Sequence, residues 1–176
     1  MKVLKSLVLV GMLLMMASAN AQTKKDRKIV NDAKKAQKTL LSADSGLERF
    51  FENSAGYVLF PNVGKGGFII GGASGNGVVY EAGERVGMAG LKKLNVGLQA
   101  GGQAIIEVIF FETEVDLERF KEGKFQFAAE TSAVALKSGI AFNAKYKEGV
   151  AVFALPKAGL MADASVGGQK FNYRPF

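Results

Sequence analysis

Seven basic residues crowd together between positions 24 and 38, where only Asp26 and Asp32 oppose them. Clustered cations attract anionic surfaces such as phospholipid headgroups, with about 1 kcal/mol for each basic residue near the surface. The residues are Lys24, Lys25, Arg27, Lys28, Lys34, Lys35 and Lys38.

The segment that carries these residues has the period of an amphipathic helix. Apolar residues repeat at i, i+4, i+7 and i+11 through Ile29, Ala33, Ala36 and Leu40, which predicts a helix over residues 23–41. Most of the basic residues fall on the opposite face. The pattern is compatible with a face that docks on anionic lipid and equally with a face that is only solvated.

A further cation stands in the glycine-rich stretch of residues 64–67, Gly-Lys-Gly-Gly. The stretch lacks the spacing of a nucleotide-binding phosphate loop, so we predict a turn between two bent strands. Lys65 at such a turn is a candidate contact for a phosphate headgroup.

The composition argues against catalysis and against a resident cofactor. The chain has no His, Cys or Trp, which removes the commonest general base, thiol chemistry, disulfides and imidazole or thiolate metal sites. Glu107 interrupts an otherwise apolar run and should be buried, most simply as a structural pair or hydrogen-bonded group. Asp163 is interpreted in the same way. We expect no enzyme and no cofactor.

The first 21 residues have the features of a cleaved signal peptide: Lys2 and Lys5, an apolar run from residue 7 to residue 16, and Ala-Asn-Ala before the expected cleavage after Ala21. Removing them leaves 155 residues, the length of one domain. The formal charge of +7 becomes +5 without the two lysines. We expect an exported protein, periplasmic or associated with the outer membrane, whose modest positive charge does not require nucleic acid.

The mature chain is predicted to be α+β. Residues 22–54 should hold N-terminal helices, the second beginning at Asp44 or Ser45, and residues 55–176 a strongly curved, barrel-like antiparallel sheet. One short helix over residues 113–121 is inserted between two strand groups. Residues 74–77 and 147–149 should be turns. Strands are expected at residues 57–60, 67–73, 77–81, 95–101, 104–111, 125–136, 140–146, 150–155, 160–166 and 170–173.

The order of motifs from Gly56 onward resembles the SYLF-domain family, lipid-binding modules that are also described as actin-binding domains in yeast proteins. The matching stretches are residues 56–61 (GYVLFP), 65–68 (KGGF), 71–79 (GGASGNGVV), 96–103 (VGLQAGGQ), 117–120 (LERF), 133–135 (AVA) and 159–168. The chain lacks the tryptophan tract of eukaryotic members and looks similar to the exported bacterial branch. The resemblance implies lipid binding, and actin is not an expected partner of an exported protein.

These patterns together predict a non-enzymatic protein associated peripherally with anionic membrane phospholipid. One alternative is a carrier that holds a hydrophobic ligand inside the curved sheet, which the thirteen phenylalanines would line or fill. A second is an integral outer-membrane β-barrel, although the strands are short for that role. The sequence leaves open the lipid and the oligomeric state.

Overall fold

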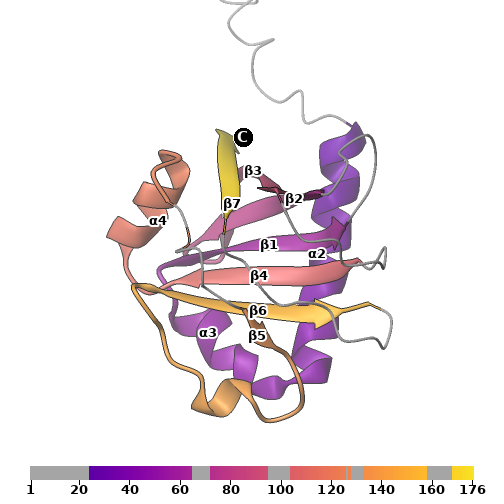
Figure 1. Ribbon diagram of the computed structural model, residues 1–176, viewed down its shortest axis with the longest axis vertical. Helices are drawn as coiled ribbons and strands as arrows, with labels where there is room; N and C mark the ends of the chain where they lie inside the picture. Colours follow the sequence, from indigo (N-terminus) through magenta and orange to yellow (C-terminus); the bar gives the residue numbers. More distant parts are fainter. Residues whose placement is uncertain (1–23, 65–71, 95–103, 126, 128–132, 158–167) are drawn as a thin grey trace, which may run out of the picture.

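The computed structural model describes residues 24–64, 72–94, 104–125, 127, 133–157 and 168–176. Over these residues the chain has an α+β fold with three α-helices and a seven-stranded sheet (Figure 1). The strand order is β5-β6-β4-β1-β2-β3-β7, and every pair in it is antiparallel except β5 with β6. The predicted fold class and the largely antiparallel sheet are therefore confirmed.

The helical elements are α2 (Lys24–Ala43), η1 (Ser45–Leu47), α3 (Glu48–Asn53), α4 (Glu114–Lys121) and η2 (Ala141–Asn143), where η denotes a 3-10 turn. The strands are β1 (Gly56–Gly64), β2 (Gly72–Glu81), β3 (Glu84–Leu94), β4 (Ile105–Phe111), β5 (Val134–Ala135), β6 (Val150–Pro156) and β7 (Gln169–Pro175). The predicted N-terminal helices and the inserted helix are all present. Thr113 caps α4, since its Oγ1 accepts a hydrogen bond from the amide of Asp116 at 3.3 Å.

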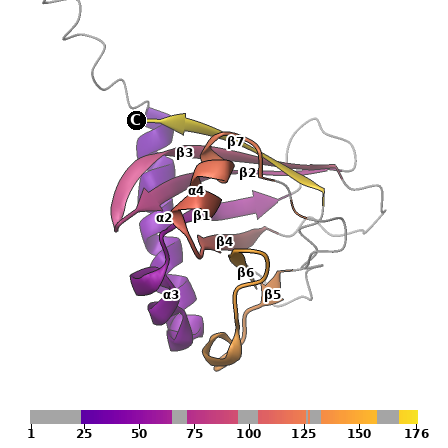
Figure 2. The ribbon, with the colours of Figure 1, turned by 90° about the vertical axis from the view of Figure 1, so that its left-hand side faces the viewer.

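Helices α2 and α3 cover one face of the sheet (Figure 2). The buried stripe of α2 packs there against alternate residues of the central strands, including Leu59 and Val108. Burial of this apolar stripe against the sheet stabilises the helix. The basic outer face buries no apolar surface and so does not contribute to this stabilisation. Helix α2 thus packs on the first face of the sheet through the apolar stripe that the sequence predicted.

The second face is covered by α4 and by aromatic side chains near it, namely Phe125 and Phe127 after the helix and Phe171 of the edge strand β7. Phe171 of β7 brings these parts together, with its ring centroid 6.1 Å from that of Phe60, 5.3 Å from Phe120 and 5.7 Å from Phe127. β7 runs across the direction of β4 and β6 in Figure 1. The aromatic rings of β7, β1, α4 and the residues after α4 therefore form one cluster on this face.

The expectation of a strongly curved, barrel-like sheet is wrong. The sheet is open, with β5 and β7 as its two edges. Both faces of the central strands carry buried apolar side chains, as the burial of Val108 on one face and Ile109 on the other illustrates. A sheet that is apolar on both faces is buried by covering layers on each side, and closure on itself is not needed.

Two local predictions also need correction, and one strand is additional to those predicted. Residues 74–77 are not a turn but lie within β2, where a Cβ on Gly77 would come within 2.6 Å of the Phe60 ring. The glycine thus permits the close approach of a neighbouring side chain. β3 was not predicted at all. Residues 140–146 are not a strand, because η2 and its flanks bond to the N-terminal helices instead of to a neighbouring strand.

Several predictions lie wholly or mainly outside the described residues. They are the signal peptide over residues 1–21 and the strands at residues 67–73, 95–101, 125–136 and 160–166.

Candidate functional site

The basic residues of α2 form an exposed surface on the side of the helix that faces away from the sheet. We call it the basic face; all its members are exposed, namely Lys24, Lys25, Arg27, Lys28, Lys34, Lys35 and Lys38. Lys24, Lys28, Lys35 and Lys38 follow the spacing i, i+4, i+11 and i+14, which places them in one row. At 1.5 Å per residue the row extends for about 21 Å along the helix. The structure brings together seven of the eight predicted site residues.

The acidic residues of α2 offset this face less than the sequence suggests. Asp26 is buried, and its Oδ2 accepts a hydrogen bond from Nη2 of Arg174 in β7 at 2.7 Å. Its charge is thereby directed toward the body of the protein and compensated there. Asp32 is partly exposed. The eighth predicted residue, Lys65, lies outside the described residues.

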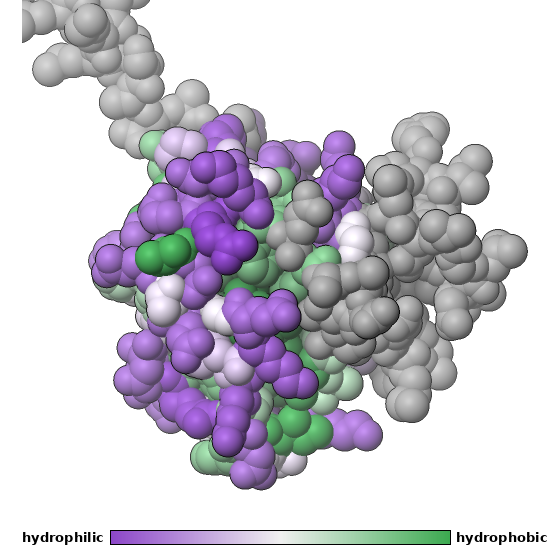
Figure 3. Space-filling view, turned by 60° about the vertical axis from the view of Figure 1, so that its left-hand side comes forward, coloured by the Kyte–Doolittle hydropathy of each residue, from purple (hydrophilic) through white to green (hydrophobic). Residues whose placement is uncertain are grey.

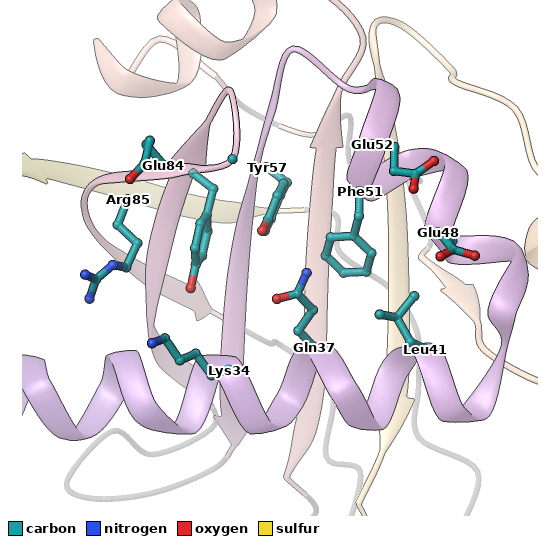
Figure 4. Close-up of a pocket in the computed structure, with 11 residues that line it drawn as sticks. Lys34, Gln37, Leu41, Glu48, Phe51, Glu52, Tyr57, Glu84 and Arg85 are labelled. Carbon is teal, nitrogen blue, oxygen red and sulfur yellow. The ribbon is translucent and has the colours of Figure 1, made fainter.

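A pocket of about 490 Å³ opens beside the basic face, between α2, α3 and the β2–β3 hairpin (Figure 4). Lys34, Arg85 and Glu84 lie toward one end of it, and Glu48 and Glu52 of α3 toward the other. Aromatic rings lie between these charged ends. The first end thus carries two cations and one anion and the second carries two anions, so an anionic group would be repelled most strongly from the second end. Lys34 belongs both to this pocket and to the basic face.

Two tyrosines stack in the pocket wall. The rings of Tyr57 in β1 and Tyr80 in β2 lie 4.6 Å apart at 13°, because these residues are paired in the strand register. Burial raises the pKa of each hydroxyl above its usual range. The nearby Tyr80 raises the pKa of Tyr57 further, and a hydrogen bond from Gln37 lowers it. Arg85 lowers the pKa of Tyr80. Both tyrosines are therefore neutral near pH 7. They can donate hydrogen bonds to a ligand but cannot serve as bases.

Glu107 has the predicted burial, with no exposed surface. Its Oε2 accepts a hydrogen bond from the amide Nε2 of Gln169 in β7 at 3.1 Å. The carboxylate faces the second side of the sheet, since its register partners Phe60 and Ala154 belong to that core. This placement agrees with a structural role. Asp163 lies outside the described residues.

Sequence reasoning missed the pocket, together with Arg85 and the tyrosine pair. The separate strands at residues 57–60 and 77–81 were predicted, but nothing in their composition shows which residues face each other across them. Arg85 lies in β3, whose glycines and alanine gave no strand signal. The pairing of Tyr57 with Tyr80 depends on the register of β1 against β2, for which the sequence carries no signal.

Two features are absent from the described residues. No helix there is both long enough and apolar enough to span a membrane. No group of three or more His, Cys, Asp or Glu side chains that could hold a metal ion lies together among the described residues.

The fold and site define an α+β protein with a basic helix lying on an open sheet. No family model matches the chain. An 83-residue stretch is 31% identical to Beta cell expansion factor A from Aeromonas veronii, and it covers 46% of this chain but only 32% of that protein. The chain thus aligns with about a third of the length of this relative.

Proposed function

We propose that this protein is an exported, non-enzymatic lipid-binding protein of the SYLF type that associates peripherally with anionic membrane phospholipid. The basic face of α2 makes the contact. The chain acts after removal of its first 21 residues, in the periplasm or at the outer membrane.

One observation carries the proposal: all seven basic residues are exposed on a helix whose opposite stripe is buried. The helix cannot rotate this face away from solvent without exposing Leu40 and Val30, which are almost fully buried. The cations are therefore presented in a fixed arrangement. Each contributes about 1 kcal/mol near an anionic membrane, and salt screens the attraction over about 8 Å at physiological ionic strength.

Co-sedimentation with vesicles tests the proposal. The mature protein should bind vesicles of phosphatidylcholine mixed with phosphatidylglycerol and should not bind phosphatidylcholine alone. Changing Lys28, Lys34, Lys35 and Lys38 to Gln should weaken binding more than 100-fold, because four contacts of about 1 kcal/mol are lost. Thermal stability should change little, since the four side chains are exposed.

A matched variant separates the basic face from net charge. Changing the exposed lysines Lys92, Lys124, Lys157 and Lys170 to Gln removes the same charge from other parts of the protein. We expect this variant to retain most of the binding. If both variants lose affinity equally, net charge accounts for it; if the α2 variant binds like the parent, the lipid site lies elsewhere, with Lys65 the next candidate.

The interior gives less support to the alternative of a hydrophobic-ligand carrier. Phe60, Phe110, Phe111, Phe120 and Phe153 are fully buried and several of their rings lie in contact with one another. Phenylalanines that would line a cavity are thus engaged in packing within the described part of the chain.

A further inference from the structure

Two large hydrophobic side chains are exposed in one short loop. Among the described residues, Val115, Ile140, Phe142 and Phe176 are the exposed large hydrophobic side chains, and Phe142 is 60% exposed. Ile140 and Phe142 flank Ala141 at η2, in the connection between β5 and β6. On the face shown in Figure 3, hydrophobic side chains appear as separate patches among hydrophilic ones. A phenylalanine left in water forgoes a favourable transfer of apolar surface, which entry into an apolar layer would recover.

The loop is held firmly against the N-terminal helices. Asp44 is 2% exposed, and its carboxylate accepts hydrogen bonds from the amides of Ala141 at 2.8 Å and Gly46 at 2.9 Å. Nη2 of Arg49 donates to the carbonyl of Ala141 at 3.0 Å and also to that of Ala144.

The ring of Phe142 rests on Gly46, where any Cβ would come within 3.0 Å of ring carbons. These contacts fix the loop while leaving most of the ring uncovered. The exposure is therefore part of a fixed structure and does not reflect a loose segment.

The loop that carries the two side chains has an excess of positive charge on its exposed surface, although the buried carboxylate of Asp44 lies against Ala141. Residues 137–148 contain exposed Lys137, Lys145 and Lys147 and one acidic residue, Glu148. The neighbouring Glu112 lies in a surface hollow that also contains Arg49 and Lys145. An aromatic tip among lysines suits the boundary between anionic headgroups and acyl chains, where the ring enters the apolar layer and the lysines remain at the headgroups.

We propose that Ile140 and Phe142 form an insertion tip that enters the headgroup boundary of an anionic bilayer. This inference rests on the proposed membrane association and adds an apolar anchor to the electrostatic attraction of the basic face. A bilayer fits the loop better than a second copy of the chain. In a symmetric dimer through this loop, the lysines of one copy would face the same lysines of the other.

A single tryptophan can report on the tip, because the chain has none of its own. In F142W, anionic vesicles should shift the tryptophan emission to the blue, and brominated acyl chains should quench it. The matched control is V115W on α4, a residue that is 68% exposed and lies on a different part of the molecule from η2 (Figure 1). Its emission should not change on the same vesicles.

A second variant measures the contribution of the tip to binding. Changing Ile140 and Phe142 to Ser should weaken vesicle binding about tenfold or more, through loss of buried apolar surface in the complex. The melting temperature should stay close to that of the parent, since both side chains are exposed in the free protein. An unchanged affinity would overturn the proposed tip.

The remaining outcomes separate the two proposals. If F142W sediments with anionic vesicles but its emission neither shifts nor is quenched, the tip is overturned and the role of the basic face stands. If the protein sediments with no vesicle, both proposals are overturned. A blue shift of F142W that grows with protein concentration in the absence of lipid would overturn the tip in favour of self-association. Equal quenching of V115W would also overturn it.

Discussion

The carboxylate of Asp44 joins two parts of the chain that are nearly a hundred residues apart. One oxygen accepts from Gly46 at the start of η1, and the other accepts from Ala141 in η2. The Asp44 amide also bonds to the carbonyl of Leu40 and so closes the end of α2. A local capping residue thereby also determines where a distant loop lies.

Asp44→Ala should lower the free energy of unfolding by about 2–4 kcal/mol, because two buried amides lose a charged acceptor. Asp44→Asn retains one acceptor oxygen, so we expect about half of that loss. Urea unfolding followed by circular dichroism measures both. Asp32→Ala, which removes a carboxylate of α2 outside this network, is the control and should change stability by less than about 0.5 kcal/mol. Equal stability of Asp44→Ala and the parent would mean that water satisfies both amides.

Helix α2 carries its buried apolar side chains and its exposed basic side chains on separate faces. Val30, Ala33, Ala36 and Leu40 are buried against the sheet, and Ile29 at the margin of this stripe is partly buried. The lysines on the other face make no contribution to the core. Stability and surface charge can therefore be changed independently in this element.

Leu40→Ala should reduce the free energy of unfolding by about 3 kcal/mol, through lost burial and the cavity left behind. Lys38→Ala, two residues away on the basic face, should alter it by no more than about 0.5 kcal/mol. Chemical denaturation measures the stability of both variants, and vesicle binding shows whether Leu40→Ala affects the basic face. At a temperature where Leu40→Ala is folded, it should bind anionic vesicles like the parent; weak binding by this folded variant would show that the two faces are not independent.

At the scale of the whole molecule, β7 connects the C-terminal end of the chain to both layers. Phe171 packs into the second core, and Arg174 reaches Asp26 in the first turn of α2, 148 residues earlier in the chain. The side chain of Arg174 is half exposed while that of Asp26 is nearly buried. The edge strand thus secures the beginning of the helix that carries the basic face.

Arg174→Gln should reduce stability by about 1–2 kcal/mol, because a hydrogen bond to a charged group contributes about 1.5–3 kcal/mol and solvent around the half-exposed Arg174 weakens this one. Amide hydrogen exchange should rise in the first turn of α2 and in β7, while β1 and β4 stay protected. Lys170→Gln, at an exposed position of the same strand, is the matched control. If exchange rises equally in all strands, Arg174 supports global stability and not this particular connection.

Periodicity in the sequence predicted the position of those helices and strands whose formation depends on residues close to one another in the chain. Both faces of α2 follow from the spacing of apolar and basic residues, and Thr113 identifies the start of α4. Apolar runs identified the strands near Tyr57, Val108 and Val152. In each of these elements, residues within a few positions of one another supply the signal.

Tertiary structure alone decided which strands meet and what lies between them. β3 is a strand because β2 and β7 pair with it, and its Gly87 accommodates β7, since a Cβ there would lie 2.5 Å from the carbonyl oxygen of Arg174. Residues 140–146 form no strand because Asp44 and Arg49 bind their backbone groups. The open sheet, the tyrosine pair and the exposed position of Phe142 likewise depend on contacts between residues far apart in the chain, and a local pattern carries no information about such contacts.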